Sequence, residues 1–374
     1  MRDNIRDKFI TILFCVIIGA FLVVGSYRLV NPVKTSEAER RPLAQLPSNV
    51  TWESIIDRSA IEKTESALTD QFPMREFFRT LKAEFKIHVL GAKENNRIAV
   101  EDGYYAKIES AFDDRLTDYS IGRLVYIYEK YLKDNGGEKF VSLIPDKNYF
   151  FARDYGYPGP DYDNLRDKVQ AALPGMTYID IFDTLELSDY YRTDTHWSQP
   201  ELAETVQRLI MMMNPELVAS SEAHVTEYTE HRLEGFDGVY KGQISLITKP
   251  DTLVYLTDPV IDGCTVYDYE TGKTSGIYNP ELFERADQYD VFLAGTRALL
   301  RIDNPNAGAD KELILFRDSF GSSIAPLMVD GYKSIYLVDI RYISPDYLGE
   351  FIDFSGKDVL FLYSAMILNQ KAFK

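Results

Sequence analysis

The sequence contains few of the residues that bind transition metals or form disulfide bonds. Its 374 residues include 4 histidines and 2 cysteines. Cys15 lies inside an apolar run and Cys264 is alone in the rest of the chain, so no intrachain disulfide is expected there. The sequence has no H-E-x-x-H motif, no paired C-x-x-C motif and no phosphate-binding glycine loop. We therefore predict neither a metal site nor a cofactor.

Positive charge is also in short supply. Lys and Arg number 41 against 58 Asp and Glu, which gives a formal net charge of -17. Because nucleic-acid binding depends on neutralising phosphates with Lys and Arg, this balance argues against nucleic acid as a partner. Hydrophobic residues make up 45% of the chain and aromatic residues 13%, which excludes a disordered protein. The composition is that of a large folded protein.

The N-terminus lacks charge entirely between Lys8 and Arg28. The run FITILFCVIIGAFLVVGSY would form a helix about 28 Å long, close to the ~30 Å thickness of a bilayer's hydrocarbon core. Residues 1–28 are therefore interpreted as an uncleaved signal anchor that ties the chain to a membrane. A cleaved signal peptide, with the small residues at Val24-Gly25-Ser26 before the cut, is the alternative.

The bulk of the chain follows this apolar run, which favours export of residues 29–374. Basic residues flank the run on both sides and leave the orientation open on charge alone. A large exported domain without disulfides fits a bacterial cell surface. We expect a single-pass membrane protein with its domain outside the cytoplasm, and secretion after cleavage as the alternative.

Four regions are expected along the chain. Residues 29–50 contain three prolines and no long apolar periodicity, which is typical of a linker after the anchor at 1–28. Residues 51–374 are predicted to form one domain, whose first part, 52–90, is helical. Within it, residues 224–288 are rich in Val, Thr, Tyr and turn signals, which indicates a β-rich insertion.

Short apolar runs alternate with helical segments through most of the remaining chain. Strands are predicted at 139–144, 177–182, 289–294, 312–316, 334–340 and 358–363. Helices are predicted at 119–134, 164–173, 199–213 and 322–331. Most of the strand runs lack strict alternation of apolar and polar residues, as expected for strands covered on both faces. This order predicts an α/β fold with a parallel sheet flanked by helices.

Polar residues follow several of the predicted strands. In open parallel sheets, ligands bind beyond the carboxyl ends of the strands. Lys147, Gly295, Thr296, Arg317 and Arg341 occupy such positions. They are candidates for contacts to substrate or to an oxyanion.

The stretch RDSFGSS offers a nucleophile. Ser319 follows an apolar strand and precedes a predicted helix, where N-terminal N–H groups favour negative charge. A serine hydroxyl needs a base. His196 in YYRTDTHWSQ can serve as that base, with Asp194 holding its tautomer. The alternative interpretation is structural, with Ser319 as a helix cap and Asp194 and His196 as a buried hydrogen-bonded pair.

The neighbours of these motifs suggest further roles. Trp197 is expected to pack behind the histidine or to line an acyl site. His224, Glu227 and His231 have helix-like spacing, but the β-branched residues around them favour a strand, in which the two histidines face opposite ways. A metal-dependent phosphoesterase with Asp194 and His196 as ligands lacks an identifiable third ligand.

The two motifs resemble those of the DHHW proteins and of the related polysaccharide O-acetyltransferases typified by the alginate-acetylating proteins, which have an SGNH-hydrolase-like domain. The stretches ERRPLAQLPS, VSLIPDKNYFF, FDGVYKG and LVDIRYI resemble further family motifs in the same order. The resemblance implies a catalytic triad of Asp194, His196 and Ser319. The chain departs from the family pattern at Thr195, where the motif has histidine, and at Arg317, where the usual block has glycine.

The resemblance implies an extracytoplasmic serine O-acetyltransferase or acetylesterase that acts on a cell-envelope polysaccharide. It also implies a membrane-bound O-acyltransferase as the partner that supplies acetyl groups. The alternative is a catalytically inactive envelope scaffold or glycan-binding protein of the same fold.

Overall fold

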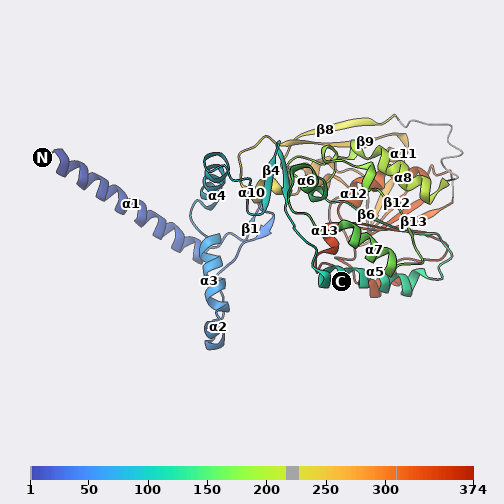
Figure 1. The fold of residues 1–374 in the computed structure, drawn as a ribbon, viewed down its shortest axis with the longest axis horizontal. Helices are drawn as coiled ribbons and strands as arrows, with labels where there is room; N and C mark the ends of the chain where they lie inside the picture. Colours follow the sequence, from blue (N-terminus) through green and yellow to red (C-terminus); the bar gives the residue numbers. More distant parts are fainter. Residues whose placement is uncertain (1, 216–226, 309) are drawn as a thin grey trace. The chain divides into compact units, whose positions relative to one another are not determined.

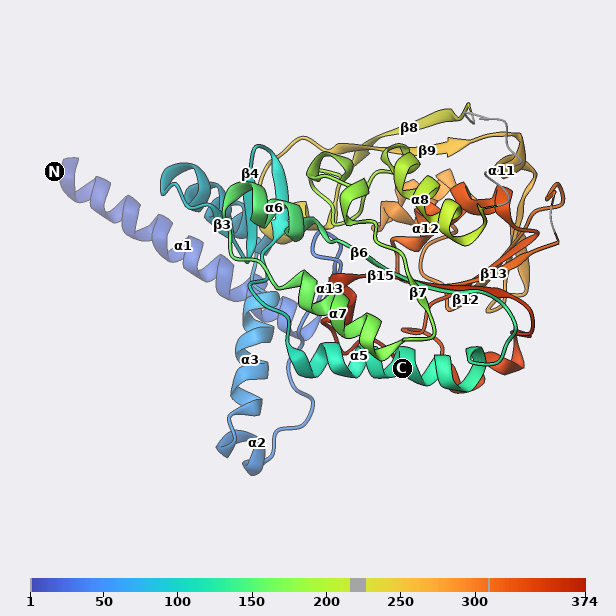
Figure 2. The same ribbon diagram turned by 45° about the vertical axis from the view of Figure 1, so that its right-hand side comes forward.

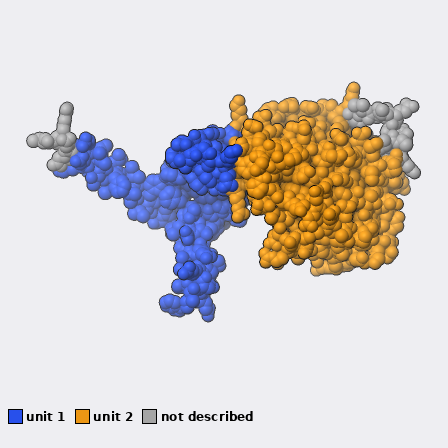
Figure 3. All heavy atoms as spheres, viewed as in Figure 1, with its two compact units in different colours: residues 1–96, 241–248 blue, residues 97–240, 249–374 orange. Residues whose placement is uncertain are grey.

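The computed structural model describes residues 2–215, 227–308 and 310–374. The chain divides into two compact units (Figure 3), one of residues 1–96 with 241–248 and the other of residues 97–240 with 249–374. The candidate catalytic residues all belong to the second unit. The predicted linker at 29–50 and the predicted domain boundary after it remain predictions.

An eight-stranded sheet forms the centre of the second unit (Figure 1), in the order β11-β10-β12-β14-β13-β15-β6-β7. The five strands from β14 to β7 run parallel, whereas β12, β10 and β11 pair antiparallel at the other edge. The strands are β6 (Lys139–Ile144), β7 (Thr177–Tyr178), β10 (Thr265–Asp268), β11 (Lys273–Ser275), β12 (Leu299–Asp303), β13 (Glu312–Arg317), β14 (Ser334–Val338) and β15 (Asp358–Ser364).

The two faces of the sheet belong to different hydrophobic clusters. Along β13, Leu313 and Leu315 pack in one cluster, and Ile314 and Phe316 in the other. This alternation follows from the two-residue period of a strand. Because both faces are covered, the strand is apolar throughout, which explains why strict alternation is missing from the sequence.

Helices cover both faces of the sheet (Figures 1 and 2). One face carries α5 (Asp114–Ile127), α7 (Tyr162–Ala172) and α13 (Ala365–Leu368), and the other α8 (Ala203–Met213) and α12 (Gly321–Ile324). Further elements of this unit include β4 (Ile98–Glu101), β5 (Tyr104–Lys107), α6 (Lys147–Tyr155), β8 (Thr229–Phe236), β9 (Asp251–Thr257) and α11 (Pro259–Gly263). Helix α10 (Val239–Ile244) begins in this unit. The predicted α/β fold class, an SGNH-hydrolase-like parallel sheet flanked by helices, is confirmed.

The described part of the predicted β-rich insertion, 227–288, contains an antiparallel hairpin of β8 and β9 followed by the edge strands β10 and β11. Two predicted strands are wrong in part or in full. The 177–182 strand ends at Tyr178. Residues 288–291 form a 3-10 helix instead, because Asp287 caps the turn by accepting from the Tyr289 N–H group. The strand β12 was not predicted.

The first unit begins with α1 (Arg2–Val30), in which Ile5–Val30 is long and apolar enough to cross a membrane. A signal sequence has the same properties. The unit continues with β1 (Thr35–Ser36), β2 (Arg41–Pro42), α2 (Trp52–Ile56), α3 (Ser59–Asp70), α4 (Arg75–Glu84), a π-helix (Phe85–Val89) and β3 (Glu94–Asn95). The helices within 52–90 confirm the predicted helical segment.

Candidate active site

Ser319 lies in the turn that follows β13, the strand flanked by β14 and β15. The preceding residue, Asp318, holds this turn in place. Its carboxylate accepts hydrogen bonds from Phe320 N (3.0 Å), Ser364 N (2.9 Å) and Ser364 Oγ (2.7 Å). The end of β13 is thereby tied to the end of β15, and the half-buried Ser319 is presented at the carboxyl edge of the parallel strands.

His196 reaches Ser319 from a loop 123 residues earlier in the chain. Its Nε2 lies 2.7 Å from Ser319 Oγ, and its Nδ1 lies 2.6 Å from Asp194 Oδ1. Asp194 Oδ1 also accepts from the His196 backbone N at 3.0 Å. The carboxylate is fully buried, and 8% of His196 is exposed. Carboxylate, imidazole and hydroxyl thus form one continuous hydrogen-bonded chain.

The segment that follows β8 holds the other carboxylate oxygen of Asp194. Asp194 Oδ2 accepts from Val239 N at 2.8 Å, and Thr193 O accepts from Tyr240 N at 3.0 Å. Gly238 makes this approach feasible, because a Cβ there would lie 2.2 Å from the Thr193 carbonyl carbon. The side chain of Asp194 is therefore fixed by two backbone segments as well as by the histidine.

Lys147 binds the backbone of the loop that carries Asp194 and His196. Its Nζ donates to the carbonyls of Tyr191 (2.5 Å), Arg192 (2.7 Å) and Asp194 (3.0 Å). Burial lowers the pKa of Lys147 to about 7, although the charges of Asp194 and Asp251 oppose this shift. All three hydrogens of the ammonium are committed to carbonyls, so the contacts of Lys147 are those of a residue that shapes the loop.

The rings of Tyr289 and Phe320 pack against the imidazole, and Ser323 and Trp197 hold these rings in place. Tyr289 stacks on His196, with ring centroids 3.9 Å apart and planes 9° apart. Trp197 is fully buried and packs edge-on against Phe320. These contacts are those of a residue packed behind His196, and a role in lining an acyl site remains a prediction. Ser323 Oγ accepts from both Trp197 Nε1 and Tyr289 Oη, each at 2.8 Å. Burial raises the pKa of Tyr289 well above its usual value, which keeps this hydroxyl protonated as a donor.

The two candidate arginines share one carboxylate. Arg341 binds Asp339 through Nε (2.9 Å) and a terminal nitrogen (2.6 Å), and a terminal nitrogen of Arg317 lies 3.8 Å from the same carboxylate. Arg317 is 1% exposed, and burial lowers its pKa. Their observed contacts join the ends of β13 and β14, and contacts with a substrate remain a prediction.

The candidates Gly295 and Thr296 lie just beyond Tyr289 on the same segment. Gly295 N donates to Phe292 O at 3.1 Å, and Thr296 O accepts from the Arg297 guanidinium at 2.8 Å. Gly295 has a left-handed φ of 80°, which favours glycine, and a Cβ there would lie 2.0 Å from Asp290 Oδ1, so the Asp290 side chain would have to move. A role in stabilising an oxyanion remains a prediction for both.

The remaining histidines lie outside this arrangement. His224 is not among the described residues. His231 stacks on Tyr255 and lies 2.9 Å from Thr257 Oγ1. His88 is 65% exposed and pairs with Glu84, although the apolar periodicity of 52–90 places it on the apolar side of its helix. Within the described ranges, no group of three His, Cys, Asp or Glu residues is placed to hold a metal ion.

Sequence reasoning missed Tyr289, Ser323 and the Gly238–Tyr240 segment. Ser323 follows Ser319 by four residues, the spacing that places side chains on one side of a helical turn, and this was a usable signal. The stretch FDGVYKG resembles a family motif, and its two glycines are a signal of close backbone contact. Nothing local in the sequence marks Tyr289, because its contact with His196 depends on the fold.

Comparison with known proteins agrees with this architecture. The family model described as DHHW protein matches residues 180–338, which include the loop of His196 and the turn of Ser319. The resemblance to the DHHW family predicted from the motifs is confirmed. No match was found among curated proteins.

Solved structures with the same fold include a DHHW family protein from Eubacterium siraeum, with 21% identity and a TM-score of 0.58 over 74% of this chain and 94% of that one. Bacillus cereus PatB1 has 20% identity and a TM-score of 0.55 over 74% of this chain and 98% of that one. A second structure of PatB1, with a sulfonyl adduct, has 19% identity and a TM-score of 0.54 over 74% of this chain and 97% of that one. At these identities the likeness shows the fold.

Proposed function

We propose that the chain is an extracytoplasmic serine O-acyltransferase or esterase that acts on acetyl groups of a cell-envelope polysaccharide. The observation that carries the proposal is the hydrogen-bonded chain from Asp194 through His196 to Ser319, with distances of 2.6 and 2.7 Å. A serine so placed has a base within reach of its proton and a carboxylate that orients the base. The resemblance of the motifs to polysaccharide O-acetyltransferases supports the choice of substrate.

In the first step, Ser319 Oγ attacks the carbonyl carbon of an acetyl ester while His196 Nε2 takes the hydroxyl proton. The bond to the leaving alcohol then breaks, and His196 returns the proton to that alcohol. An acetyl-serine remains. In the second step, a sugar hydroxyl or water loses its proton to His196 and attacks the acetyl carbon. The bond from that carbon to Ser319 Oγ breaks, and His196 returns the proton to Ser319 Oγ. Transfer and hydrolysis differ only in which hydroxyl enters.

The tetrahedral intermediate needs donors for its oxyanion. The N–H groups of Phe320 and Gly321, the first after the serine, already donate to Asp318 at 3.0 and 3.2 Å. We propose the N–H of Ser319 itself as one donor and the N–H of Thr296 as the second, because the N–H of the other candidate, Gly295, already donates to Phe292 O at 3.1 Å. The N–H groups that the sequence predicted as oxyanion donors, at the start of the helix, therefore mainly hold the turn at Asp318.

The acetyl donor and the location belong to the same proposal. The apolar helix α1 supports a single-pass anchor with the rest of the chain outside the cytoplasm. A membrane-bound O-acyltransferase is the proposed source of acetyl groups, because the resemblance implies one. Polysaccharide is the proposed acceptor.

The test uses the full chain in detergent with two reagents. The first is 4-nitrophenyl acetate, and the second is phenylmethanesulfonyl fluoride, whose sulfur an activated serine attacks with loss of fluoride. We expect the rate of acetate release to fall by about 10⁴-fold in Ser319→Ala and in His196→Ala. Mass spectrometry should locate the sulfonyl group on Ser319. Ser355→Ala, which removes an exposed hydroxyl, is the matched control and should match the wild type.

Equal acetate release by wild type, Ser319→Ala and His196→Ala would contradict the proposal. Failure of the sulfonyl fluoride to modify Ser319 in the folded wild type, together with the absence of acetate release, would favour an inactive scaffold or glycan-binding protein. Loss of activity on addition of a chelator would point to metal-dependent chemistry.

A further inference from the structure

The first unit exposes an apolar surface on one helical segment. Helix α4 and the π-helix that follows it carry large side chains that are between 38% and 66% exposed, namely Phe77, Phe78, Leu81, Phe85, Val89 and Leu90. These residues recur at helical spacing and form what we call the α4 apolar face. A contiguous exposed surface of this kind marks an interaction site.

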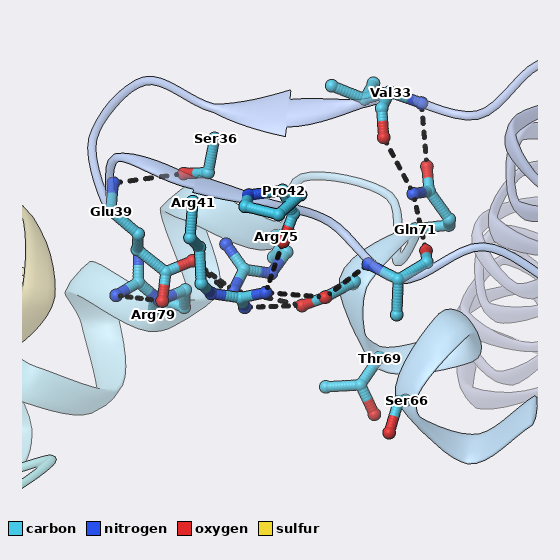
Figure 4. Close-up of polar contacts among 12 residues, drawn as sticks. Val33, Ser36, Glu39, Arg41, Pro42, Ser66, Thr69, Gln71, Arg75 and Arg79 are labelled. Carbon is cyan, nitrogen blue, oxygen red and sulfur yellow. Dashed lines mark hydrogen bonds and ion pairs between the residues drawn. The ribbon is translucent and has the colours of Figure 1, made fainter. Parts of the chain in front are cut away.

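Ion pairs prevent the helix from turning this face inward (Figure 4). Arg75 pairs with Glu39 and with Asp70, and Arg79 lies 3.2 Å from Glu39. Arg79 also donates to the carbonyls of Gly242 and Gln243 at 3.0 and 3.1 Å. The arginine side chains are 10% and 15% exposed. Rotation of α4 would break these buried contacts, so the polar side is fixed and the apolar face stays outward.

The same unit places this segment against α1. The ring of Phe21 stacks on Phe72 at 5.6 Å and lies 6.0 Å from Phe78. Phe21 precedes Tyr27, the last residue of the uncharged run, by six residues, or about 9 Å along a helix. If α1 spans a bilayer, Phe72 and Phe78 therefore lie within the apolar layer. An amphipathic helix in a membrane interface is buried by about 5–10 Å, the same depth.

The charges on this segment suit a lipid surface. Of the four basic side chains in residues 75–89, Arg75 and Arg79 are held in ion pairs, which leaves Lys82 and Lys86 to face a lipid surface. Lys82 is exposed and Lys86 is half-buried. Lysines beside an apolar face reach the headgroups while their stems cover hydrocarbon. The contact with Phe21 joins this segment to the proposed membrane helix, which favours lipid over a protein partner.

We propose that α4 and the following π-helix lie in the membrane interface, with the α4 apolar face in the hydrocarbon edge beside α1. The occupant of this face is the lipid bilayer. The inference rests on the proposed membrane anchor. It adds a second contact that holds the first unit at a set depth.

The test uses tryptophan fluorescence of the full chain in vesicles of brominated phosphatidylcholine, with and without phosphatidylglycerol. Trp52→Phe supplies the background, since the remaining Trp197 is fully buried. Phe85→Trp probes the α4 apolar face and Leu81→Trp repeats the measurement on the same face. Ile17→Trp reports insertion of α1. Tyr347→Trp, at an exposed site of the second unit, is the matched negative control.

We expect brominated lipid to quench the added fluorescence of Ile17→Trp, Phe85→Trp and Leu81→Trp at least twofold, and to leave that of Tyr347→Trp unchanged. Quenching of Ile17→Trp without quenching of the two α4 probes would overturn the inference while the anchor stands. A blue-shifted but unquenched signal from both α4 probes would show that protein covers the face, which also overturns it. No quenching at any site would remove both the anchor and the inference.

Discussion

The phenol ring of Tyr289 lies flat against the imidazole of His196, with centroids 3.9 Å apart and an angle of 9° between the planes. Its hydroxyl is bound to Ser323 Oγ, the atom that also accepts from Trp197. One face of the imidazole is therefore covered by a ring that is itself held in place. This contact restricts rotation of the histidine about its side-chain bonds and favours the geometry that points Nε2 at Ser319.

Replacing Tyr289 should separate the role of the ring from that of the hydroxyl. Tyr289→Phe keeps the stack and loses one hydrogen bond, so we expect a loss of about 1 kcal/mol in the free energy of unfolding. Tyr289→Ala opens a cavity and should cost about 3–5 kcal/mol. We expect kcat/KM for 4-nitrophenyl acetate to stay near the wild-type value in Tyr289→Phe and to fall more than 10-fold in Tyr289→Ala. Urea unfolding and initial rates measure the two effects. Equal activity of both variants would show that the stack does not position His196.

Gly238→Ala should displace the backbone of Asp194 without changing any triad side chain. A Cβ at this position would lie 2.2 Å from the Thr193 carbonyl carbon and 2.4 Å from Asp194 N, so one backbone segment must move. We expect slower sulfonylation of Ser319 and a lower melting temperature. Gly122→Ala is the control, because nothing lies within 4 Å of a Cβ there. In the helix α5 this change should stabilise the protein by about 0.5–1 kcal/mol. An unchanged rate of Ser319 sulfonylation in Gly238→Ala would show that the Gly238–Tyr240 segment does not position Asp194.

Lys147→Met should change both the stability and its pH dependence. The variant leaves the buried carbonyls of Tyr191 and Asp194 without their donor, at about 1–3 kcal/mol for each, and also the part-buried carbonyl of Arg192. The native pKa of Lys147 is lowered to about 7 from an ordinary value of 10.5, so the unfolded chain binds more protons between these pH values. Stability contributed by this residue therefore rises with pH across that window. The difference in unfolding free energy between wild type and Lys147→Met should grow from pH 7 to pH 10, as measured by urea titrations. A constant difference would contradict the lowered pKa.

Asp194→Asn should impair chemistry more than folding. The amide preserves the shape of the carboxylate but cannot accept from both His196 nitrogens and Val239 N while holding the catalytic tautomer. We expect acetate release to fall by about 10⁴-fold, as for loss of the orienting acid in a triad. Thermal unfolding should show that the protein still folds. Asp353→Asn, at an exposed turn, is the control and should keep wild-type activity. Retention of activity in Asp194→Asn would leave Asp194 with a structural role alone.

Elements with strong local signals were predictable. The strands β6, β13, β14 and β15 and the helices α5, α7 and α8 lie where the apolar runs and helical periodicities place them. The segment at 289–294 was predicted wrongly as a strand. Its apolar residues are buried, as in a strand, but Asp287 caps a helical turn and Leu293, Ala294 and Gly295 adopt left-handed φ values of 56°, 57° and 80°. Composition does not distinguish a buried strand from a buried irregular segment.

By itself, the sequence determined the charge-free run of α1, the parallel-sheet pattern and the spacing of Asp194 and His196, because each depends on neighbouring residues. It also supplied Ser319 at the end of a strand. Only the tertiary structure decided that the serine and the histidine, 123 residues apart, lie 2.7 Å from one another. The same holds for Lys147 and Tyr289, whose contacts come from distant loops. Such contacts are set by sheet order and packing, which depend on long-range burial rather than on local pattern.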